Sequence, residues 1–233
     1  MEDIRRQRLW LLGASAVVAV AIVVIAIAIG QAGGGTAGTT TGPPEGIAAT
    51  RALFAGIPQR GVELGARRAP VTVTEFADVQ CPYCGQSARD RLPDIVRRYV
   101  RPGRVKLVFR CLAFLGRDSL AGAQMAAAAA LRNRMWEFVD LVYRNQGEEG
   151  AGWVTDAYLR RVAKGAGLDV AQAFAQRRSG AALAVLSQAK AAGAAAGVRS
   201  TPTFVISRAG RAPVSVEGNT DLAGPIDDAL RAP

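Results

Sequence analysis

The 233-residue sequence contains no histidine and only three cysteines, Cys81, Cys84 and Cys111. Structural zinc sites in proteins are built from four ligands, most of them Cys or His. Three cysteines without any histidine cannot supply such a set from one chain, so we expect no metal site. The sequence also lacks a block that repeats at a fixed period, which excludes a solenoid.

Lysine and aromatic residues are scarce as well, although the formal net charge is +10 at pH 7. Only Lys106, Lys164 and Lys190 are lysines among 29 basic residues, and aromatic residues make up 6% of the chain. A nucleic-acid surface needs clustered basic residues with aromatic side chains that stack on bases, and neither feature is apparent. We interpret the arginines as scattered over solvated faces, with only non-specific attraction to anionic lipids or acidic polymers.

The most informative motif is Cys81-Pro82-Tyr83-Cys84, which follows an apolar run at residues 71–76 and begins a helix-like segment. A helix N-terminus offers unpaired N–H groups and a positive dipole end, which stabilise a thiolate on the first cysteine. The second cysteine lies one turn on and can attack a mixed disulfide. The motif therefore predicts a redox-active dithiol, with a structural or inert pair as the alternative.

The N-terminal segment is the second strong signal. Residues 9–29 carry no charge and are rich in Val, Ile and Ala, and about 20 apolar residues suffice to cross a bilayer as a helix. Three arginines precede this run and none follows before Arg51, so the positive-inside rule predicts a cytoplasmic N-terminus at residues 1–8 and an exported remainder. A cleaved signal peptide is the alternative, although its apolar region would be shorter. Disulfides persist outside the cytoplasm in either case.

The rest of the chain predicts an α/β fold with a mixed sheet and an all-helical insertion. Residues 30–60 begin with a Gly- and Thr-rich stretch and are predicted to form a flexible linker, with a short helix around residues 48–54. Strands are predicted at 61–65, at the edge of the sheet, and at 71–76, 105–110, 203–207 and 214–217. Helices are predicted at 84–99, with a kink at Pro93, and at 119–132, 135–146, 156–166, 170–177, 181–196 and 221–231.

These motifs, in this order, resemble the DsbA-like branch of the thioredoxin-fold thiol oxidoreductases, in particular its membrane-tethered exported members. Four features carry the resemblance: residues 73–78 before the dithiol, Cys81-Pro82-Tyr83-Cys84 itself, a helical insertion at about 117–197, and Gly197 to Phe204, which leads into a returning strand. The resemblance covers residues 61–233 and implies a thioredoxin fold for them. It also implies that the Thr201–Pro202 peptide bond is cis and lies beside the dithiol.

The resemblance assigns a different role to each residue of the dithiol motif. Cys81 would be the nucleophile with a lowered pKa, and Cys84 would be the buried resolving thiol. Pro82 and Tyr83 form the dipeptide that tunes the pair. Many DsbA proteins carry a histidine in this dipeptide, and Tyr83 cannot add its positive charge, which favours a less oxidising pair.

Residues outside the motif complete the predicted site. Thr201 and Pro202 would bind the substrate backbone by strand-like pairing and keep metals off the thiols. Glu75 matches the buried acid of the fold, a proton relay near the resolving thiol; Asp78 is the rival acid, and a solvated strand residue is the alternative for Glu75. Cys111 is predicted to be a buried free cysteine that acts as a small apolar residue, with intermolecular pairing or a regulatory thiol as the alternative.

The function that the resemblance implies is a cofactor-free, extracytoplasmic thiol–disulfide oxidoreductase that introduces disulfides into exported proteins through Cys81 and Cys84. Its partners would be cysteine-containing exported proteins and a quinone-linked membrane reoxidase of the DsbB or VKOR type. Residues 9–29 would hold it in the cell membrane as a single-pass protein. The alternatives are a thiol reductase or isomerase in the same compartment, or a tethered binding or chaperone module with a non-catalytic disulfide.

Overall fold

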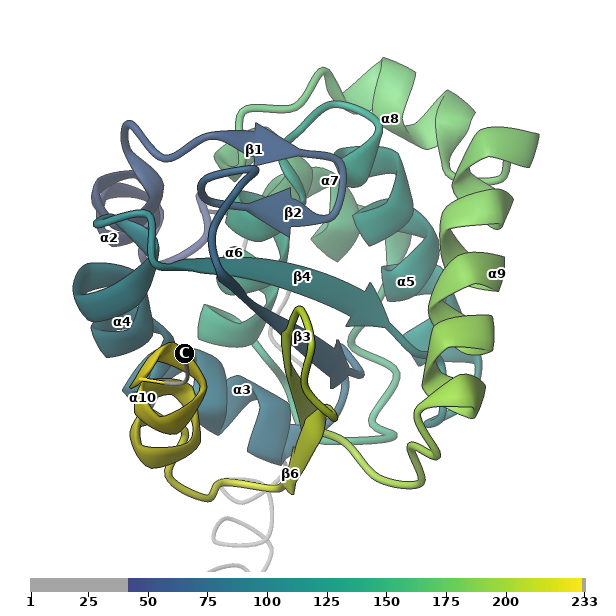
Figure 1. The fold of residues 1–233 in the computed structure, drawn as a ribbon. Coiled ribbons are helices and arrows are strands. Elements are labelled where there is room, and N and C mark those ends of the chain that lie inside the picture. Colours follow the sequence, from purple (N-terminus) through teal and green to yellow (C-terminus); the bar gives the residue numbers. More distant parts are fainter. Residues whose placement is uncertain (1–41, 232–233) are drawn as a thin grey trace, which may run out of the picture. The chain divides into compact units, whose positions relative to one another are not determined.

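The structure, a computed structural model, describes residues 42–231, which belong to one compact unit that begins at Gly42 (Figure 1). The predicted membrane segment at residues 9–29, with its flanking residues 1–8 and 30–41, lies outside the described residues. Among residues 42–231, no helix combines the length and the apolar character needed to cross a bilayer.

A six-stranded mixed sheet forms the centre of the unit, in the order β1-β2-β4-β3-β5-β6 (Figure 1). Strand β3 pairs parallel with β4 and antiparallel with β5, so the predicted parallel central pair is confirmed. The short edge strand predicted at residues 61–65 is present as β2, but an unpredicted strand, β1, lies outside it. The strands are β1 Gln59–Arg60, β2 Glu63–Leu64, β3 Val71–Ala77, β4 Val105–Cys111, β5 Thr203–Arg208 and β6 Val214–Glu217.

The helical block predicted between β4 and β5 is present as five helices, α5 to α9, each within two residues of the predicted ends. Side-chain caps fix several of these ends; for example, Asp169 accepts a hydrogen bond of 3.0 Å from the Gln172 N–H at the start of α8. Such a cap satisfies a backbone donor that the helix itself leaves free. The helices of the block are α5 Arg117–Ala130, α6 Met135–Arg144, α7 Asp156–Gly165, α8 Val170–Gln176 and α9 Gly180–Ala195.

The helix predicted at residues 84–99 begins earlier and is divided into three segments. They are α3 Pro82–Asp90, α4 Leu92–Ile95 and η1 Val96–Val100, the last a π-helix. Arg91, at the break, has φ −116°. Pro93 has no N–H to donate and its ring crowds the carbonyl four residues earlier, so a break near Pro93 follows from the sequence.

The predicted linker at residues 30–60 ends earlier than expected, because residues 42–60 belong to the compact unit. Helix α2 Ile47–Phe54 matches the short helix predicted around residues 48–54. It buries Thr50, whose hydroxyl donates to the Asp140 carboxylate, and Phe54, whose ring lies 6.3 Å from that of Trp136. These contacts attach the segment to α6 and make it part of the fold.

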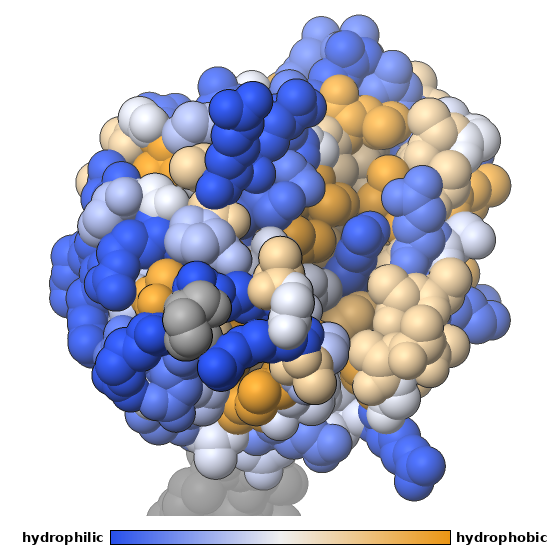
Figure 2. Space-filling model, viewed as in Figure 1, coloured by the Kyte–Doolittle hydropathy of each residue, from blue (hydrophilic) through white to orange (hydrophobic). Residues whose placement is uncertain are grey.

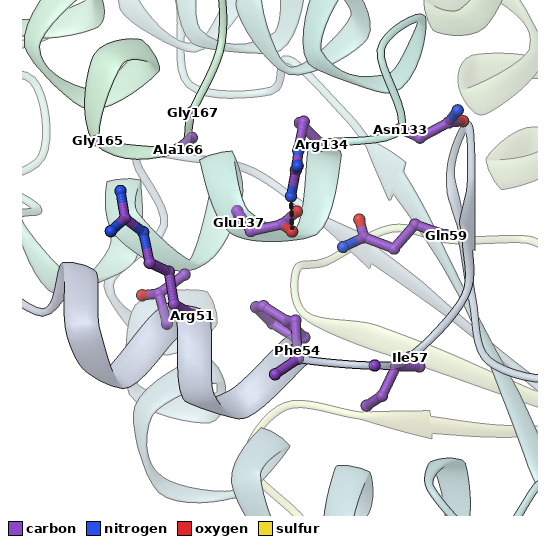
Figure 3. Close-up of a pocket in the computed structure, with 13 residues that line it drawn as sticks. Arg51, Phe54, Ile57, Gln59, Asn133, Arg134, Glu137, Gly165, Ala166 and Gly167 are labelled. Carbon is purple, nitrogen blue, oxygen red and sulfur yellow. Dashed lines mark hydrogen bonds and ion pairs between the residues drawn. The ribbon is translucent and has the colours of Figure 1, made fainter.

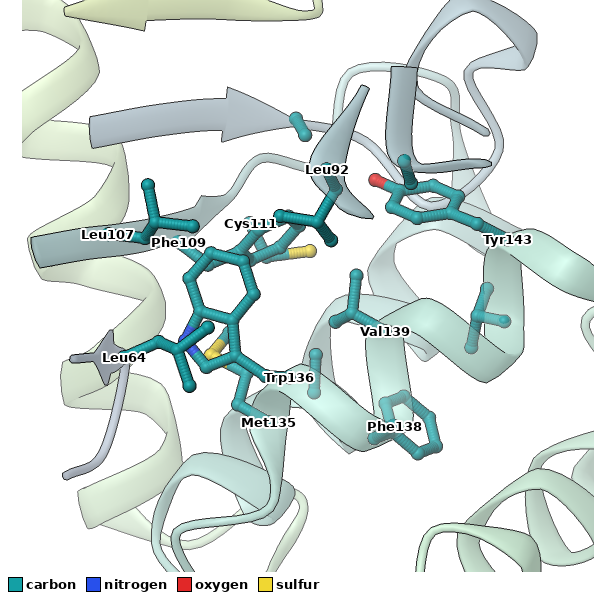
Figure 4. Packing of buried hydrophobic residues seen from close by; sticks show 14 of the residues in the cluster. Leu64, Leu92, Leu107, Phe109, Cys111, Met135, Trp136, Phe138, Val139 and Tyr143 are labelled. Atoms are coloured by element: carbon teal, nitrogen blue, oxygen red, sulfur yellow. The ribbon is translucent and has the colours of Figure 1, made fainter. Parts of the chain in front are cut away.

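The main core lies between one face of the sheet and α6 (Figure 4). Side chains alternate along a strand, so Leu107, Phe109 and Cys111 of β4 all point to this face. Trp136 packs edge-on against Phe109 with ring centroids 5.8 Å apart, and Val139 lies one turn further along α6. The aromatic and aliphatic side chains of α6 are all buried.

The opposite face of the sheet carries a smaller cluster beneath α9. Phe76 of β3 and Leu112 pack with Ala189 of α9. The outer side of α9 is rich in alanine and includes Leu183, which is exposed, so apolar colours gather over this helix in Figure 2. The last helix, α10 Ala223–Arg231, packs against β5 and β3 and completes the unit.

A test of the packing is offered by Gly122 of α5, whose added Cβ would lie 2.5 Å from Cγ2 of the buried Val79. Alanine is the better helix former by about 1 kcal/mol, but overpacking a core costs about 1–3 kcal/mol. We therefore expect Gly122→Ala to lower the free energy of unfolding, measured by urea titration. Gly180→Ala, where a Cβ meets open space, is the control and should not destabilise. Equal or greater stability of Gly122→Ala would contradict the packing described here.

Candidate active site

The dithiol motif is placed by the turn between β3 and α3. Cys81 is the N-cap of α3, with φ −64° and ψ 117°, and its carbonyl accepts the N–H groups of Cys84 and Gly85 at 3.1 Å each. Pro82 occupies the first helical turn, where its missing N–H costs nothing and its fixed φ suits the helix. The sequence therefore starts the helix at the dithiol, as predicted.

The two motifs that are distant in sequence meet at Cys81. Its Sγ lies 3.2 Å from the Thr201 carbonyl oxygen, to which Cys81 donates when it is protonated. The Thr201–Pro202 peptide bond is cis, as predicted. Antiparallel pairing of β5 with β3, which sets Thr203 opposite Phe76, brings this segment to the end of β3 that leads into the dithiol.

The surroundings of Cys81 favour its thiolate. A hydrogen bond from the Cys84 thiol is the largest influence, and hydrogen bonds from the Thr201 side chain and from the backbone N–H groups of Cys84 and Tyr83 add to it. Burial opposes them, and together they lower the pKa of Cys81 to about 6. At neutral pH the Cys81 thiol is therefore mostly ionised, which makes it the stronger nucleophile of the pair.

Cys84 is the last residue of the motif, and its surroundings raise its pKa instead of lowering it. Its side chain is fully buried, and burial is the main cause that raises its pKa; the hydrogen bond to Cys81 adds to the rise. The two thiols thus have opposed shifts, one reactive and one kept protonated. Pro82 and Tyr83 between them are exposed, Tyr83 to 62%, so the dipeptide faces solvent.

Glu75 lies on the core face of β3, in line with Val73 and Ala77. It is buried rather than solvated, and burial raises its pKa to about 8. Its charge is also among the causes that raise the pKa of Cys84, so the two groups lie within electrostatic reach of each other. A carboxyl group with this pKa holds a proton at neutral pH and can give it up.

Asp78, the alternative to Glu75 as the buried acid, uses its carboxylate to hold the loops around the dithiol in place. Its buried carboxylate accepts from the N–H of Gln80 at 2.9 Å, of Phe114 at 2.7 Å and of Leu115 at 3.1 Å. The Ser119 hydroxyl donates to it as well, at 2.6 Å. The four donors around this carboxylate join two loops: residues 78–81, called here the dithiol loop, and the loop between β4 and α5. The role of Asp78 is therefore structural.

Two residues near the end of α6 contact the dithiol loop and were not predicted. The Gln146 side-chain amide donates to the carbonyl oxygens of Val79, at 2.9 Å, and Cys81, at 3.0 Å. The Tyr143 hydroxyl donates to the Asp78 carbonyl at 3.2 Å. A glutamine or tyrosine at a helix end carries no motif, and the fold alone brings it to a loop more than 60 residues earlier.

Cys111 lies in the core beside the site. It is buried and free, as predicted, and burial raises the pKa of its thiol (Figure 4). Cys81 and Cys84 are also present as free thiols. Within residues 42–231, no group of three or more His, Cys, Asp or Glu side chains is arranged to hold a metal ion.

A pocket of about 550 Å³ lies elsewhere, between α2, the start of α6 and the turn after α7 (Figure 3). Its walls include Phe54, Gln59 and Glu137, and an ion pair joins Glu137 to Arg134 at 2.9 Å. None of the residues predicted for the site lines this pocket. The candidate site is therefore the dithiol and its surroundings.

The lowered pKa of Cys81 gives a direct test. In the reduced protein, iodoacetamide should label Cys81 with a pH midpoint near 6, because the thiolate is the reacting species. All three thiols are buried, but Cys84 and Cys111 should stay unlabelled at these pH values because their pKa values are raised while that of Cys81 is lowered. Mass spectrometry of the labelled peptides measures all three, and a midpoint near the ordinary value of about 8.5 would contradict the geometry.

Comparisons with known proteins agree with this geometry. A family model described as "Thioredoxin" matches residues 59–220, well over half of the chain. The chain is 35% identical over 103 residues to the "Probable disulfide bond formation protein D" of Bacillus cereus, a match that covers 43% of this chain and 48% of that protein. The chain thus spans about half the length of this curated relative.

Solved structures show the same fold. Oxidised BdbD from Bacillus subtilis superposes with a TM-score of 0.64 at 21% identity, covering 76% of this chain and 98% of that one. A variant of alpha-DsbA1 from Wolbachia pipientis gives 0.63 at 19% identity, covering 78% and 96%. The superpositions show that the chain shares its fold with these two proteins, and the family match establishes that it belongs to the thioredoxin family.

Proposed function

We propose that this chain is an extracytoplasmic thiol–disulfide oxidoreductase that donates its Cys81–Cys84 disulfide to cysteine-containing exported proteins. The observation that carries the proposal is the contrast between the two thiols at the start of α3. The pKa of Cys81 is lowered to about 6, and the Cys81 thiol lies beside the Thr201 carbonyl, while Cys84 is buried behind it. This contrast is what a dithiol catalyst needs, since one sulfur must react and leave easily.

The reaction begins with the oxidised protein. A substrate thiolate attacks Cys81 Sγ, the Cys81–Cys84 bond breaks, and Cys84 leaves as a thiolate that takes up a proton. A second substrate thiolate then attacks the substrate sulfur of the mixed disulfide, and Cys81 leaves as a thiolate. The substrate loses two electrons and gains a disulfide, and the protein keeps those electrons as a reduced dithiol. The low pKa of Cys81 favours the second step, because a weakly basic thiolate is the better leaving group.

Two further roles are part of the proposal. Glu75 supplies the proton that Cys84 takes up, because its raised pKa keeps it protonated near neutral pH and its carboxyl group lies within electrostatic reach of Cys84. Thr201 lies beside Cys81 just before β5 and presents backbone groups with which an extended substrate can pair. Pro202 follows it, and its carbonyl accepts the Gly218 N–H at 2.8 Å, which holds this segment against the chain that follows β6.

The proposed location is the outer side of the cell membrane. Residues 9–29 would anchor the chain, with residues 1–8 in the cytoplasm, because the run is uncharged and arginines precede it. The name of the Bacillus cereus relative, a protein of disulfide bond formation, supports the direction of electron flow proposed here. Continued turnover then requires a membrane reoxidase, for which a quinone-linked protein of the DsbB or VKOR type is the proposed partner.

The direction of the reaction is tested by the reduction potential of the dithiol in the full-length protein, measured by equilibration with glutathione. Stabilisation of the Cys81 thiolate favours the reduced form, so we expect a potential nearer to about −120 mV than to about −270 mV. A value near the lower figure would instead indicate a reductase.

The chemistry itself is tested with single variants and a reduced model peptide that contains two cysteines. Cys81→Ser should abolish disulfide transfer, and Cys111→Ala should retain it, because Cys111 lies outside the dithiol. Undiminished activity of Cys81→Ser would leave a binding or chaperone module as the better interpretation.

The role of Glu75 predicts a pH dependence. Its pKa is about 8 in the folded state and 4.5 as the ordinary value, so the folded state binds the extra proton between these limits. Wild-type stability should therefore fall as pH rises from about 4.5 to about 8 and then level off, and Glu75→Gln should remove this fall. The oxidised variant should also react with dithiols at least about tenfold more slowly, since general acid catalysis contributes about 10²-fold or more. The exposed Glu45→Gln is the control, and unchanged pH dependence in Glu75→Gln would exclude the proposed role.

A further inference from the structure

The dithiol loop is held from outside by the loop that follows α6, residues 145–153. Gln146 is the residue of this loop that contacts Cys81: its Nε2 donates to the carbonyl oxygens of Val79 and Cys81. These two carbonyls lie on either side of the residue that precedes the nucleophile. A side-chain amide has two N–H donors, so one Gln146 amide can satisfy both carbonyls at once.

A second contact joins the same two loops. The Gln80 side chain is almost fully buried, and its Oε1 accepts from the Gly150 N–H at 3.1 Å. Its Nε2 donates to the Leu115 carbonyl at 2.8 Å. The loop at residues 145–153 is therefore fixed to the dithiol loop at two points, and Gln146 is the one that reaches Cys81 itself.

Gly85 in the first turn of α3 fits this arrangement. An added Cβ at Gly85 would overlap Gln146 Oε1, and it would lie 3.0 Å from Arg89 Nη1. The backbone of Gly85 does not require glycine, because its φ is not positive. Glycine inside a helix is less favourable than alanine by about 1 kcal/mol. The room left for Gln146 is what accounts for glycine at this position.

We propose that Gln146 is a positioning residue for Cys81, and that Gly85 leaves the space in which its amide lies. The Cys81 carbonyl also accepts the first N–H groups of α3. By fixing this carbonyl and that of Val79, the Gln146 amide sets the orientation of the first turn of α3. The backbone N–H groups of Tyr83 and Cys84 then face the Cys81 sulfur, where they stabilise the thiolate.

The test measures the pKa of Cys81 in reduced, full-length protein from the pH dependence of its alkylation by iodoacetamide. Gln146→Ala should raise this pKa by about 0.5 to 1 unit, because a hydrogen bond contributes about 1 kcal/mol and one unit corresponds to 1.36 kcal/mol. Alkylation below the midpoint should slow by about three- to tenfold. Gln146→Met, which keeps the approximate length of the side chain and removes its amide, should give the same shift.

A double-mutant cycle separates positioning from simple loss of packing. Gly85→Ala should produce a shift like that of Gln146→Ala, since its Cβ displaces the amide. The double variant should show no larger shift than either single one, because the space and the amide act on one contact. Additive shifts, or an unchanged pKa in folded Gln146→Ala or Gln146→Met, would overturn the proposal.

Matched controls come from the same chain. Gly180→Ala adds a methyl group to a helix in open space, and Gln172→Ala removes an exposed glutamine side chain from α8. Neither should change the pKa of Cys81. The importance of the positioning rests on the proposed function, but the pKa of Cys81 is measurable whatever the protein acts on. If the wild-type protein transfers no disulfide, the proposed function is refuted, but the role of Gln146 is still decided by the pKa of Cys81.

Discussion

The pairing of β3 on both sides is the constraint on which the site depends. Its parallel partner β4 and its antiparallel partner β5 hold it in the middle of the sheet. Because β5 runs against β3, the residues that enter β5 lie beside the residues that leave β3, and Thr201 meets Cys81. The chain leaves the sheet after β4, forms the long helical block, and must return to β5 in a position that keeps the contact between Thr201 and Cys81.

Burial and helix position then give two chemically identical side chains different properties. Cys81 lies where hydrogen-bond donors of α3 converge, and Cys84 lies one turn further, in the core. Glu75 is placed in the same core by the alternation of side chains along β3. A one-residue shift in the register of β3 would turn this carboxyl group to the face covered by α9, so strand pairing also determines the acid–base chemistry.

Much of this could be predicted from the sequence, because the relevant signals are local. The dithiol motif contains a signal for the start of a helix, Pro82, and the residues from Gly197 to Phe204 predict the strand that returns to the sheet. The contacts of Gln146 and Asp78 could not be predicted, since they join loops that only the folded chain brings together. The segment at residues 42–60 was predicted to be linker because the partners of its anchors Thr50 and Phe54 lie far away in the sequence, in α6.

Helix α6 extends from the hydrophobic core to the dithiol. Its first turn carries Trp136, which packs against the sheet and α2, and the residues just past its end reach the dithiol. A shortened chain in which a turn replaced the helical block would keep Cys81, Cys84 and the segment that contains Thr201. It would lose the amide beside Cys81 and the hydroxyl on the Asp78 carbonyl. If Gln146 positions Cys81 as proposed, the smallest chain with the reactivity of this dithiol is larger than its thioredoxin core, and transplanting the motif alone into a smaller scaffold would not transfer that reactivity.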